Sequence, residues 1–357
     1  MMLRVRVPGK LILLGEYAVL EGADALVIAV DRYALVRIEE PPSDGGFQLG
    51  TSLHKASINF GFDEDGKIVP DNSPEEEQWQ QLAFARQAIE AICRRLASAG
   101  FTVKPFSIAI NTDQFYLSGD QKVGLGSSAA LITAIVYALA SFHDARHVLL
   151  PDEPALFHFC YDVHAEVQHK QGSGIDVAAS VFGKVVQYNR YRTLNKTGDG
   201  IQVLPYLPAN LYWLPVWTGT SSSTSQLLQA MDKFRIENPS EYGLIMEKLS
   251  RLSNSGCQAL KQNNVETFLA RVKEYYFVLQ KLSQRSGIPI ISPIHEKIAG
   301  IVYQAGGYYK PSGAGEGDLG IALTTSREVL GRVTEQLKKN NIDTLKLSIS
   351  HSGVELI

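Results

Sequence analysis

The stretch Gly124-Leu125-Gly126-Ser127-Ser128-Ala129-Ala130 leads directly into residues Ala129–Ser141, which are rich in Ala, Leu and Ile and contain no helix breaker. That composition predicts a buried helix. Glycines let backbone amides approach a ligand closely, and the first amides of a helix are unsatisfied donors at the positive end of its dipole. The stretch therefore predicts a phosphate-binding loop, in which Ser127 or Ser128 caps the helix and offers a hydroxyl to a phosphate oxygen or to Mg²⁺. Without a ligand, the same residues would form only a helix N-cap.

Two further glycine-rich segments lie far from this loop in the sequence. Pro8-Gly9-Lys10 precedes the compact segment Leu11–Glu21, and Ser312-Gly313-Ala314-Gly315-Glu316-Gly317-Asp318 precedes a predicted strand. Lys10 stands between a predicted tight turn and an apolar strand, where a buried charge needs a partner. Asp176, at the start of a predicted helix, is the partner that we expect for Lys10. An aspartate in the first turn of a helix is also common without any further role.

Residues Gly61–Lys67 have the glycine and lysine spacing of a Walker A loop. Ile68, however, occupies the position where a serine or threonine would coordinate magnesium. Acidic residues within the segment would also repel phosphates. We therefore expect an exposed turn here.

Strand and helix patterns follow one another without strict alternation, which indicates an α+β fold and not a doubly wound sheet. The polar, turn-rich segment Tyr191–Gly200 places a boundary near residue 195, so we expect domains at residues 1–195 and 196–357. The predicted strands are Leu3–Val7, Ala25–Ile38, Phe106–Ile110, Lys184–Tyr188, Leu211–Thr218, Leu319–Thr324 and Thr344–Ser350. The predicted helices are Ser73–Ser98 and residues 129–141, 153–170, 174–182, 225–235, 240–262, 265–286, 293–305 and 326–339.

The bulk composition restricts the class of protein. The chain has 357 residues, a net charge of −3 and no basic run, so we expect no nucleic-acid partner. Apolar stretches such as Leu11–Leu14 and Leu26–Val30 are too short to cross a bilayer, and we expect no membrane partner. Cys93, Cys160 and Cys257 are isolated from one another, which fits a reducing cytoplasm.

Together, the three glycine-rich segments resemble the three motifs of the GHMP kinases, the small-molecule kinases named for galactose, homoserine, mevalonate and phosphomevalonate. PGKxxxxGEYAVL from Pro8 matches the first motif, GLGSSAA from Gly124 the second, and Lys310–Leu323 the third. The resemblance implies an N-terminal domain with the fold of the second domain of ribosomal protein S5, followed by a ferredoxin-like C-terminal domain. It also implies an ATP-dependent phosphotransferase, with ATP and Mg²⁺ bound in the cleft between the domains.

The resemblance assigns residues to the parts of such a site. Lys10 matches the lysine of the first motif, and Asp176 matches an aspartate that lies by the acceptor hydroxyl in mevalonate kinases. Both are catalytic candidates, and Asp176 would either remove a proton from the acceptor or hold Lys10 in place. The expected nucleotide-binding residues are Lys122, Gly124, Leu125, Gly126, Ser127, Ser128 and Ala129. The expected acceptor-binding residues are Glu16, Tyr17, Ser173, Gly174, Ser312, Gly313, Ala314 and Gly315, with a structural role for Glu16 as the alternative. The expected Mg²⁺ ligands are Ser127, Ser128 and Glu166.

Four details resemble the phosphomevalonate kinases within this family. They are the lead-in Ser118–Val123, the string GSGxDVAA from Gly172, the pair Gly317-Asp318 and the stretch WTGxxxSTS from Trp217, although Thr220 stands where a lysine is expected. The resemblance implies transfer of the γ-phosphoryl group of ATP to the anionic small molecule (R)-5-phosphomevalonate, giving 5-diphosphomevalonate on the mevalonate route to isoprenoids. Bringing two polyanions together requires cations. Lys10 is the first candidate, followed by Arg32, Lys170, Lys184, Arg190 and Arg192.

Other activities within the same resemblance stay open. The SGxD element and the EYAVL stretch also fit a mevalonate kinase, whereas a diphosphomevalonate decarboxylase usually departs from GLGSSAA. A sugar kinase, or a nucleotide-binding homologue without catalytic activity, completes the alternatives. Both a monomer and a homodimer are compatible with the sequence.

Overall fold

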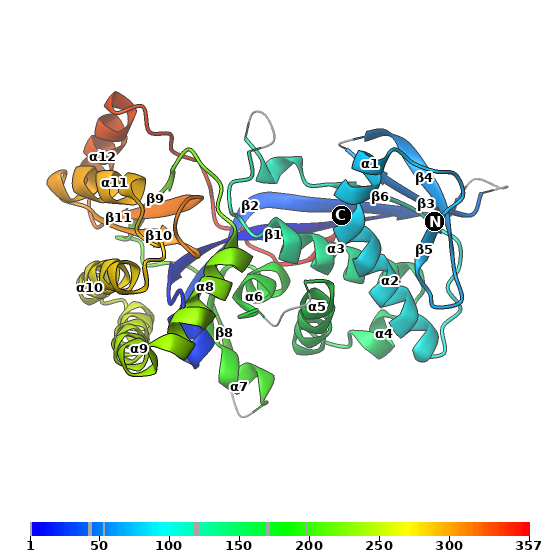
Figure 1. The fold of residues 1–357 in the computed structure, drawn as a ribbon, viewed down its shortest axis with the longest axis horizontal. Helices are drawn as coiled ribbons and strands as arrows, with labels where there is room; N and C mark the ends of the chain where they lie inside the picture. The colour runs from blue at the N-terminus through cyan, green and yellow to red at the C-terminus, as the bar shows by residue number, and fades with distance from the viewer. Residues whose placement is uncertain (1, 42–44, 53, 118–120, 169–171, 197–198) are drawn as a thin grey trace.

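Two long antiparallel strands, β1 (Met2–Leu14) and β2 (Asp24–Glu39), run through the centre of the molecule in the computed structural model (Figure 1). The structure describes residues 2–41, 45–52, 54–117, 121–168, 172–196 and 199–357. Valine, isoleucine and leucine are frequent in both strands and suit a buried pleated surface. Exposed and buried residues alternate at the start of β1, and from Leu11 onwards every residue of the strand is buried.

Within the described residues the larger sheet has nine strands, in the order β12-β1-β2-β6-β3-β4-β5, and β2 also pairs with β7, which carries β8. Every strand pair is antiparallel except β3 with β6. The other strands are β3 (Phe47–Thr51), β4 (His54–Phe62), β5 (Ile68–Pro70), β6 (Ser107–Asn111), β7 (Val185–Asn189), β8 (Ile201–Leu204) and β12 (Glu355–Leu356).

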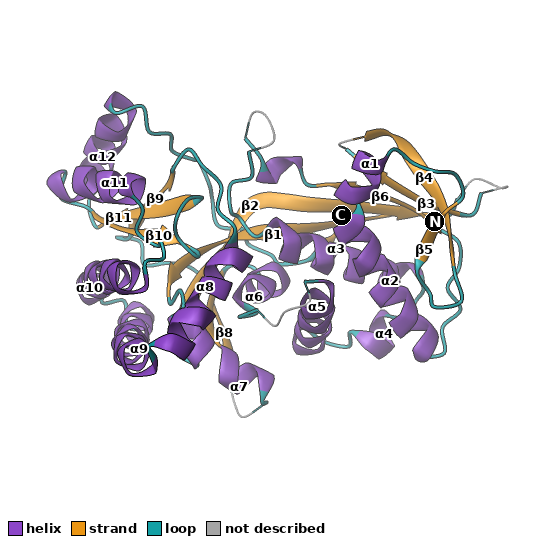
Figure 2. Ribbon diagram, in the orientation of Figure 1, coloured by secondary structure: helices purple, strands orange, loops and turns teal. Residues whose placement is uncertain are grey.

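Helices gather on one side of the central strands (Figure 2). The most buried of them, α3 (Ser127–Phe142), packs directly on β1 and β2 and is flanked by α5 (Glu153–Val167) and α6 (Ile175–Phe182). The other helical segments of this half are η1 (Ala18–Glu21), α1 (Glu76–Gln81), α2 (Ala83–Ser98), η2 (Asp113–Phe115), α4 (Arg146–Leu149) and α7 (Arg190–Leu194).

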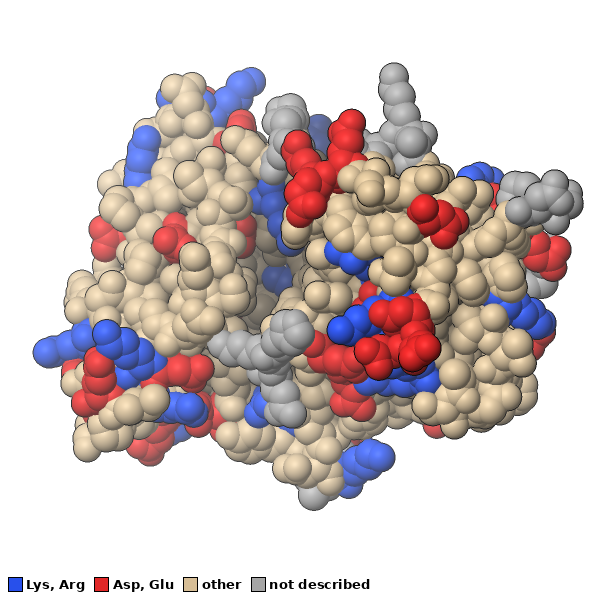
Figure 3. All heavy atoms as spheres, turned by 45° about the vertical axis from the view of Figure 1, so that its right-hand side comes forward, with Lys and Arg blue, Asp and Glu red and all other residues tan. Residues whose placement is uncertain are grey.

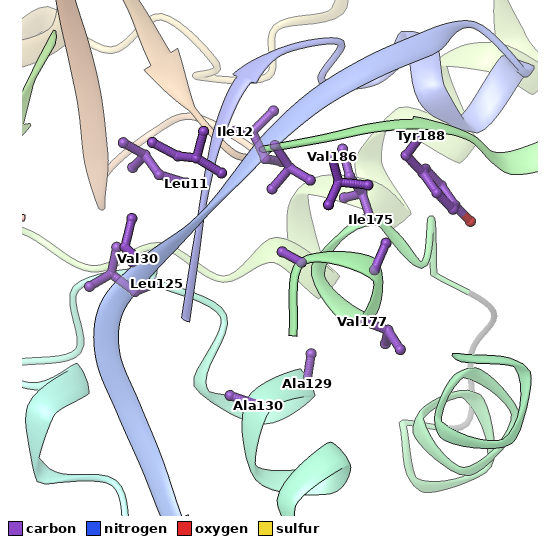
Figure 4. Close-up of a cluster of buried hydrophobic side chains, with 14 of the residues drawn as sticks. Leu11, Ile12, Val30, Leu125, Ala129, Ala130, Ile175, Val177, Val186 and Tyr188 are labelled. Carbon is purple, nitrogen blue, oxygen red and sulfur yellow. The ribbon is translucent and has the colours of Figure 1, made fainter. Parts of the chain in front are cut away.

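Apolar side chains lock the start of α3 against its neighbours. Figure 4 shows Leu11 and Ile12 of β1 in one cluster with Leu125, Ala129, Ile175, Val177, Val186 and Tyr188. All of these side chains are buried. Small alanines at the start of α3 allow the close packing that such an interior requires. The core therefore fixes the direction in which the first turn of α3 points.

The second half of the molecule contains a three-stranded antiparallel sheet in the order β10-β11-β9. Figure 1 shows this sheet and its helices at one end of the β1–β2 pair. Its strands are β9 (Tyr212–Trp217), β10 (Tyr308–Ser312) and β11 (Leu319–Thr324). Its helices are α8 (Thr224–Glu237), α9 (Pro239–Lys261), α10 (Val265–Ser286), α11 (Pro293–Gln304) and α12 (Arg327–Lys339). In the described part of the chain, no helix combines the length and the apolar character needed to cross a membrane.

Both ends of the second half return to the larger sheet. After residue 195, β8 still pairs with β7 of the larger sheet. At the other end, the Ser350 amide donates to the Ala29 carbonyl and the Ser350 carbonyl accepts from the Lys184 amide, and β12 then pairs with β1. The first strand after residue 195 and the last strand of the chain therefore both belong to the larger sheet, and residues 343–357 tie the second half to the first.

The structure confirms the α+β class. It contains elements that were not predicted, namely β3, β4, β5, β8, β12, α4, η1 and η2, and it differs from three of the predicted segments. The predicted helix Ser73–Ser98 begins only at Glu76 and is divided at Leu82 into α1 and α2. The segment predicted to be irregular after Tyr191 contains the short helix α7. The predicted strand Thr344–Ser350 makes only isolated bridges, because this part of the chain crosses from β9 to β2.

Candidate functional site

A cleft of about 600 Å³ brings the three glycine-rich segments together. Figure 3 shows a hollow between the two halves of the molecule, with basic side-chain atoms at its floor. The lining includes residues of the first segment, the predicted phosphate-binding loop before α3, the start of α6, the loop before α8 and the third segment. The Walker-like segment Gly61–Lys67 is instead the turn between β4 and β5, as predicted, where the Asp63 carboxylate accepts from the Lys67 backbone amide.

Left-handed glycines shape the loop before α3. Gly124 and Gly126 have φ values of +73° and +76°, and Gly126 is the N-cap of the helix without any side-chain cap. The prediction that Ser127 or Ser128 caps α3 is therefore wrong, because both serines are already helical residues. Both line the cleft, and neither hydroxyl has a hydrogen-bond partner among the described residues. The first turn of α3 thus presents free donors to the cleft. Leu125 and Ala129 support this loop from the core and do not line the cleft.

Lys10 lies directly against this loop. The predicted tight turn at Pro8-Gly9 is instead a register shift within the continuous strand β1. A Cβ on Gly9 would lie 2.7 Å from the Leu125 carbonyl oxygen, so the absent side chain permits the strand to approach the loop. The Lys10 amide donates to the Leu125 carbonyl (2.8 Å), and Lys10 Nζ donates to the Gly124 carbonyl (3.0 Å). The predicted phosphate-binding loop therefore positions this ammonium group.

Asp176 lies in the first turn of α6 and lines the same cleft. Its Oδ1 accepts from the Val177 amide (3.0 Å). No ion pair within 4.0 Å joins it to Lys10 in the described structure, so the expected direct pairing of Lys10 with Asp176 is not formed. Ser173 also lines the cleft, whereas Gly174 is the left-handed N-cap of α6 and packs against Tyr188.

Glu16 pairs with a lysine that sequence reasoning did not select. The side chains of Glu16 and Lys310 are only 2% and 0% exposed, and they form an ion pair across 294 residues of chain. Tyr17, next to Glu16, takes a left-handed backbone conformation with φ of 62° and donates its hydroxyl proton to the Ala314 carbonyl. Burial, with the nearby Glu16 charge, raises the pKa of the Tyr17 phenol far above its ordinary value. Tyr17 is therefore a neutral donor near pH 7.

The third segment is anchored to the first along its first half. The Ser312 hydroxyl accepts from the Ile12 amide (2.9 Å) and donates to the Ile12 carbonyl (3.0 Å), so its hydrogen bonds are used within the protein. Gly313 and Ala314 line the cleft. Gly315, with φ of +88°, packs against Ile290 and does not line it.

Asp318 and Ser222 are lining residues that were not among the predicted site residues. The Asp318 carboxylate accepts from the Ser222 amide (3.2 Å) and hydroxyl (2.7 Å). A Cβ on Gly124 would lie 2.5 Å from the Asp318 Cγ, so Asp318 directly abuts the predicted phosphate-binding loop. Partial burial lowers the pKa of Lys122, the Asp318 charge opposes that shift and the Lys10 charge adds to it. Two features of the sequence could have identified these residues, namely the aspartate in the third segment and the Ser/Thr-rich stretch after Trp217.

Glu166 does not lie with the other predicted residues. Its carboxylate pairs with Arg94 (2.6 Å) and Arg95 (2.8 Å) on α2, and it does not line the cleft. Partial burial would raise the pKa of Glu166, but hydrogen bonds from the two arginines lower it. A carboxylate held in this way is not available to a metal in the cleft.

The lysine and arginine side chains that line the cleft within the described residues are Lys10 and Lys122. Arg32 and Arg192 pair with Asp31 and Asp24 outside it. Arg190 donates to the Gly172 carbonyl (3.4 Å) behind the lining, Lys184 does not line the cleft, and Lys170 lies outside the described residues.

Comparisons with known proteins show which families and folds the chain resembles. Residues 83–184 match the family described as GHMP kinases N terminal domain. The chain is 29% identical over 337 residues to the phosphomevalonate kinase of Streptomyces sp. strain CL190, covering 88% of each chain. It is 22% identical to the mevalonate kinase of Arabidopsis thaliana, with both chains covered fully. Among solved structures, Streptococcus pneumoniae phosphomevalonate kinase in complex with phosphomevalonate and AMPPNP superposes with a TM-score of 0.75 at 22% identity, covering 97% of this chain and 99% of that one.

Proposed function

We propose that this chain, a phosphotransferase of the GHMP kinase family, transfers the γ-phosphoryl group of ATP to (R)-5-phosphomevalonate and so forms 5-diphosphomevalonate. The observation that carries the proposal is the position of Lys10, which hydrogen-bonds to the phosphate-binding loop and lines the same cleft as Asp176. We call Lys122, residues 124–128 and Asp318 the nucleotide end of the cleft. We call Lys10, Glu16, Ser173 and Asp176 the acceptor end.

The nucleotide end is suited to a triphosphate. Its donors are the free amides of the first turn of α3 and the hydroxyls of Ser127 and Ser128, with Lys122 at the rim. Such an arrangement favours negative charge without a large rearrangement. The unpartnered serine hydroxyls fit Mg²⁺ carried by the nucleotide, and we propose them as its protein ligands in preference to Glu166. When bound, Mg²⁺ would offset the charge on the phosphate oxygens.

At the acceptor end, cations matter more than a base for a phosphorylated acceptor. The second pKa of a phosphate monoester is about 6, so most of the acceptor is already dianionic at neutral pH. Lys10 would bind the incoming anion and the transferred group together, which reduces the repulsion between two polyanions. Asp176 would then accept a proton only from the singly ionised fraction of the acceptor.

A second candidate is mevalonate, whose hydroxyl must lose its proton during transfer. The presence of Asp176 in the cleft, within the same lining as Lys10, favours this acceptor, since a carboxylate can act as the base. We rank it second because the chain carries the Gly317-Asp318 and Trp217–Ser225 patterns that resemble phosphomevalonate kinases.

The three cysteines are free and buried, which fits the proposed cytoplasmic location.

The first experiment measures ADP release with Mg-ATP and, in separate reactions, 5-phosphomevalonate, mevalonate, 5-diphosphomevalonate and galactose. We expect turnover with 5-phosphomevalonate. Turnover with mevalonate in its place would transfer the assignment to the second candidate. Nucleotide binding without turnover in any reaction would instead favour a homologue that has lost its chemistry.

The role of Asp176 is tested by Asp176→Asn across pH 5.5–8.5. With 5-phosphomevalonate we expect the loss in kcat to be greatest below pH 6 and to shrink above pH 7, because the acceptor loses its own proton with a pKa of about 6. A loss of about 10²–10⁴-fold that persists at pH 8.5 would instead identify Asp176 as an obligatory base, as expected for a hydroxyl acceptor. A kcat equal to wild type at every pH would remove Asp176 from the chemistry.

A further inference from the structure

A buried ion pair lies directly behind the acceptor end. Lys310, on β10, is fully buried, and its Nζ donates to Glu16 Oε1 and to the carbonyl of Pro311. Glu16 follows β1, so the pair joins a segment of the larger sheet to the smaller sheet. Removing one partner of such a pair leaves an uncompensated buried charge, which costs far more than the intact pair contributes.

The Glu16 carboxylate depends on Lys310 for its charge balance. Oε1 accepts from Lys310 and, at 3.4 Å, from the Gly313 amide. Oε2 is buried and has no hydrogen-bond partner among the residues that the structure describes. In the described structure, Lys310 is thus the cation within ion-pair distance of this carboxylate.

Lys10 is close enough to Lys310 to influence its titration. Burial lowers the pKa of Lys310, the Glu16 charge opposes that shift, and the Lys10 charge lowers the pKa further. Lys10 and Glu16 also line the same cleft. Of the two lysines that line the cleft in the described structure, Lys10 is the one whose charge acts on Lys310, so we expect it to compensate Glu16 if Lys310 lost its charge.

We propose that Lys310 is a positioning residue for the acceptor end, which neutralises Glu16 and thereby keeps the Lys10 ammonium free to bind an anionic acceptor. Lys310 is not among the residues that line the cleft, so it acts through Glu16 and Lys10. The inference rests on the proposed function in one respect, namely that Lys10 binds the acceptor. It predicts that substitutions at positions 16 and 310 do not have additive effects on the acceptor KM.

The first test compares steady-state kinetics of Lys310→Met, Glu16→Gln and the double variant, using the acceptor that wild type turns over. Lys310→Met should raise the acceptor KM about tenfold or more and change the KM for ATP by less than about threefold. In the double variant no carboxylate competes for Lys10, so its acceptor KM should return to within about threefold of Glu16→Gln alone. Lys233→Met removes an exposed lysine paired with Glu237 on α8 and is the control for charge change.

A purely structural role would give a different pattern. Lys310→Met and the double variant would then both lower the melting temperature, and neither acceptor KM would change. Equal acceptor KM values for Lys310→Met and the double variant would also overturn the proposal.

The second test does not require turnover and separates this inference from the proposed function. Lysines are ¹³C-dimethylated and the pKa of Lys10 is followed by NMR, with Lys10→Met identifying its signal. In Lys310→Met the Lys10 pKa should rise, because an ion pair with Glu16 favours the charged form, and in the double variant it should fall back. An unchanged Lys10 pKa would overturn the inference even if 5-phosphomevalonate is the substrate. The expected shift in an enzyme that does not use 5-phosphomevalonate would support it and reject the substrate.

Discussion

The nucleotide end and the acceptor end of the cleft are formed by different chemical groups. The nucleotide end is shaped by backbone, with left-handed Gly124 and Gly126 and the free amides of α3. The acceptor end is built from charged side chains, and its Glu16 is compensated by a fully buried lysine. Backbone donors need no counterion and leave no charge buried when the ligand departs. Charged side chains must instead be balanced within the protein, which is why the acceptor end depends on a residue outside the lining.

The third glycine segment belongs to both ends. Its first residues, Ser312 to Ala314, are hydrogen-bonded to Ile12, Glu16 and Tyr17 of the first segment. Its last residue, Asp318, abuts Gly124 and holds Ser222. A change in this segment therefore reaches both ends, whereas a change within one end should affect mainly one substrate.

The largest effect should follow from Lys10→Met, because Lys10 is the side chain that we propose contacts both the acceptor and the transferred phosphoryl group. We expect a loss of about 10²–10³-fold in kcat, the range seen when one preorganised donor to a transition state is removed. The KM for ATP should change much less, since the amides of α3 remain. Steady-state kinetics with both substrates varied would measure this.

Lys122→Met is the matched comparison at the nucleotide end. Lys122 lines the cleft at its rim but makes no hydrogen bond to the phosphate-binding loop in the described structure. Its loss should raise the KM for ATP and leave kcat within about tenfold of wild type. Equal losses in kcat for the two variants would contradict the distinction between the ends.

Low pH should lower the stability of the protein through the buried His295, which lies behind the third glycine-rich segment. His295 on α11 is buried, its Nδ1 contacts the Tyr309 hydroxyl (2.8 Å) and its Nε2 contacts the Gly317 carbonyl (3.3 Å). Burial lowers the pKa of His295 to about 4, the Gly317 hydrogen bond opposes the shift, and the Lys310 charge adds to it. The unfolded chain, with a pKa of about 6.5, then binds the proton more readily, so stability falls as pH decreases from 6.5 to 4.

The expected loss over this window is about 3 kcal/mol, from 1.36 kcal/mol for each pKa unit. Denaturant unfolding of wild type and His295→Gln between pH 4 and 7 would measure it as a difference in slope. Substitution of the exposed His351 with Gln is the control and should retain the wild-type slope. Parallel curves for wild type and His295→Gln would show that His295 does not carry this dependence.

The sequence predicted what short-range chemistry determines. The composition of residues 129–141 predicted the buried helix α3, and the glycines around Asp176 predicted its place in the first turn of α6. Local patterns succeeded because left-handed glycines and helix starts depend on neighbouring residues. The same reasoning failed for the capping serines, since Gly126 already ends the loop as N-cap.

Long-range pairs could not be predicted in this way. The partner of Glu16 is Lys310 and that of Asp318 is Ser222, separated by 294 and 96 residues. Each pairing depends on how the smaller sheet docks on the larger one, which no local spacing encodes. Lys10 was expected to pair with Asp176, but the strand shift at Gly9 directs it to the Gly124 carbonyl instead.

Gly126→Ala should affect the nucleotide end more moderately. A left-handed conformation costs a non-glycine residue about 1–2 kcal/mol, and the new Cβ would lie 2.9 Å from Lys10 Cγ. Because the Lys10 side chain can shift, we expect the KM for ATP to rise about tenfold with some loss in kcat. Gly100→Ala, with φ of +85° and open space around its Cβ, imposes the same backbone cost away from the cleft. It should lower stability by a similar amount and leave both KM values unchanged.

The smallest change in kinetics is expected from Asp318→Asn. This variant also tests most directly whether the nucleotide end depends on backbone groups. Asparagine tolerates the φ of 55° and can still accept from the Ser222 amide, so the loop should keep its shape. The negative charge beside Gly124 is removed, and the Ser222 hydroxyl, which donates to Asp318 Oδ2, would instead accept from the asparagine NH₂ group. Less repulsion of the phosphates should lower the KM for ATP about two- to threefold at low salt. The difference should disappear at high ionic strength, where such charges are screened. Asp318→Ala removes the Ser222 contacts as well and should raise the same KM. If Asp318→Asn were instead as damaging as Asp318→Ala, the carboxylate charge itself would be required, and the nucleotide end would depend on paired side chains as the acceptor end does.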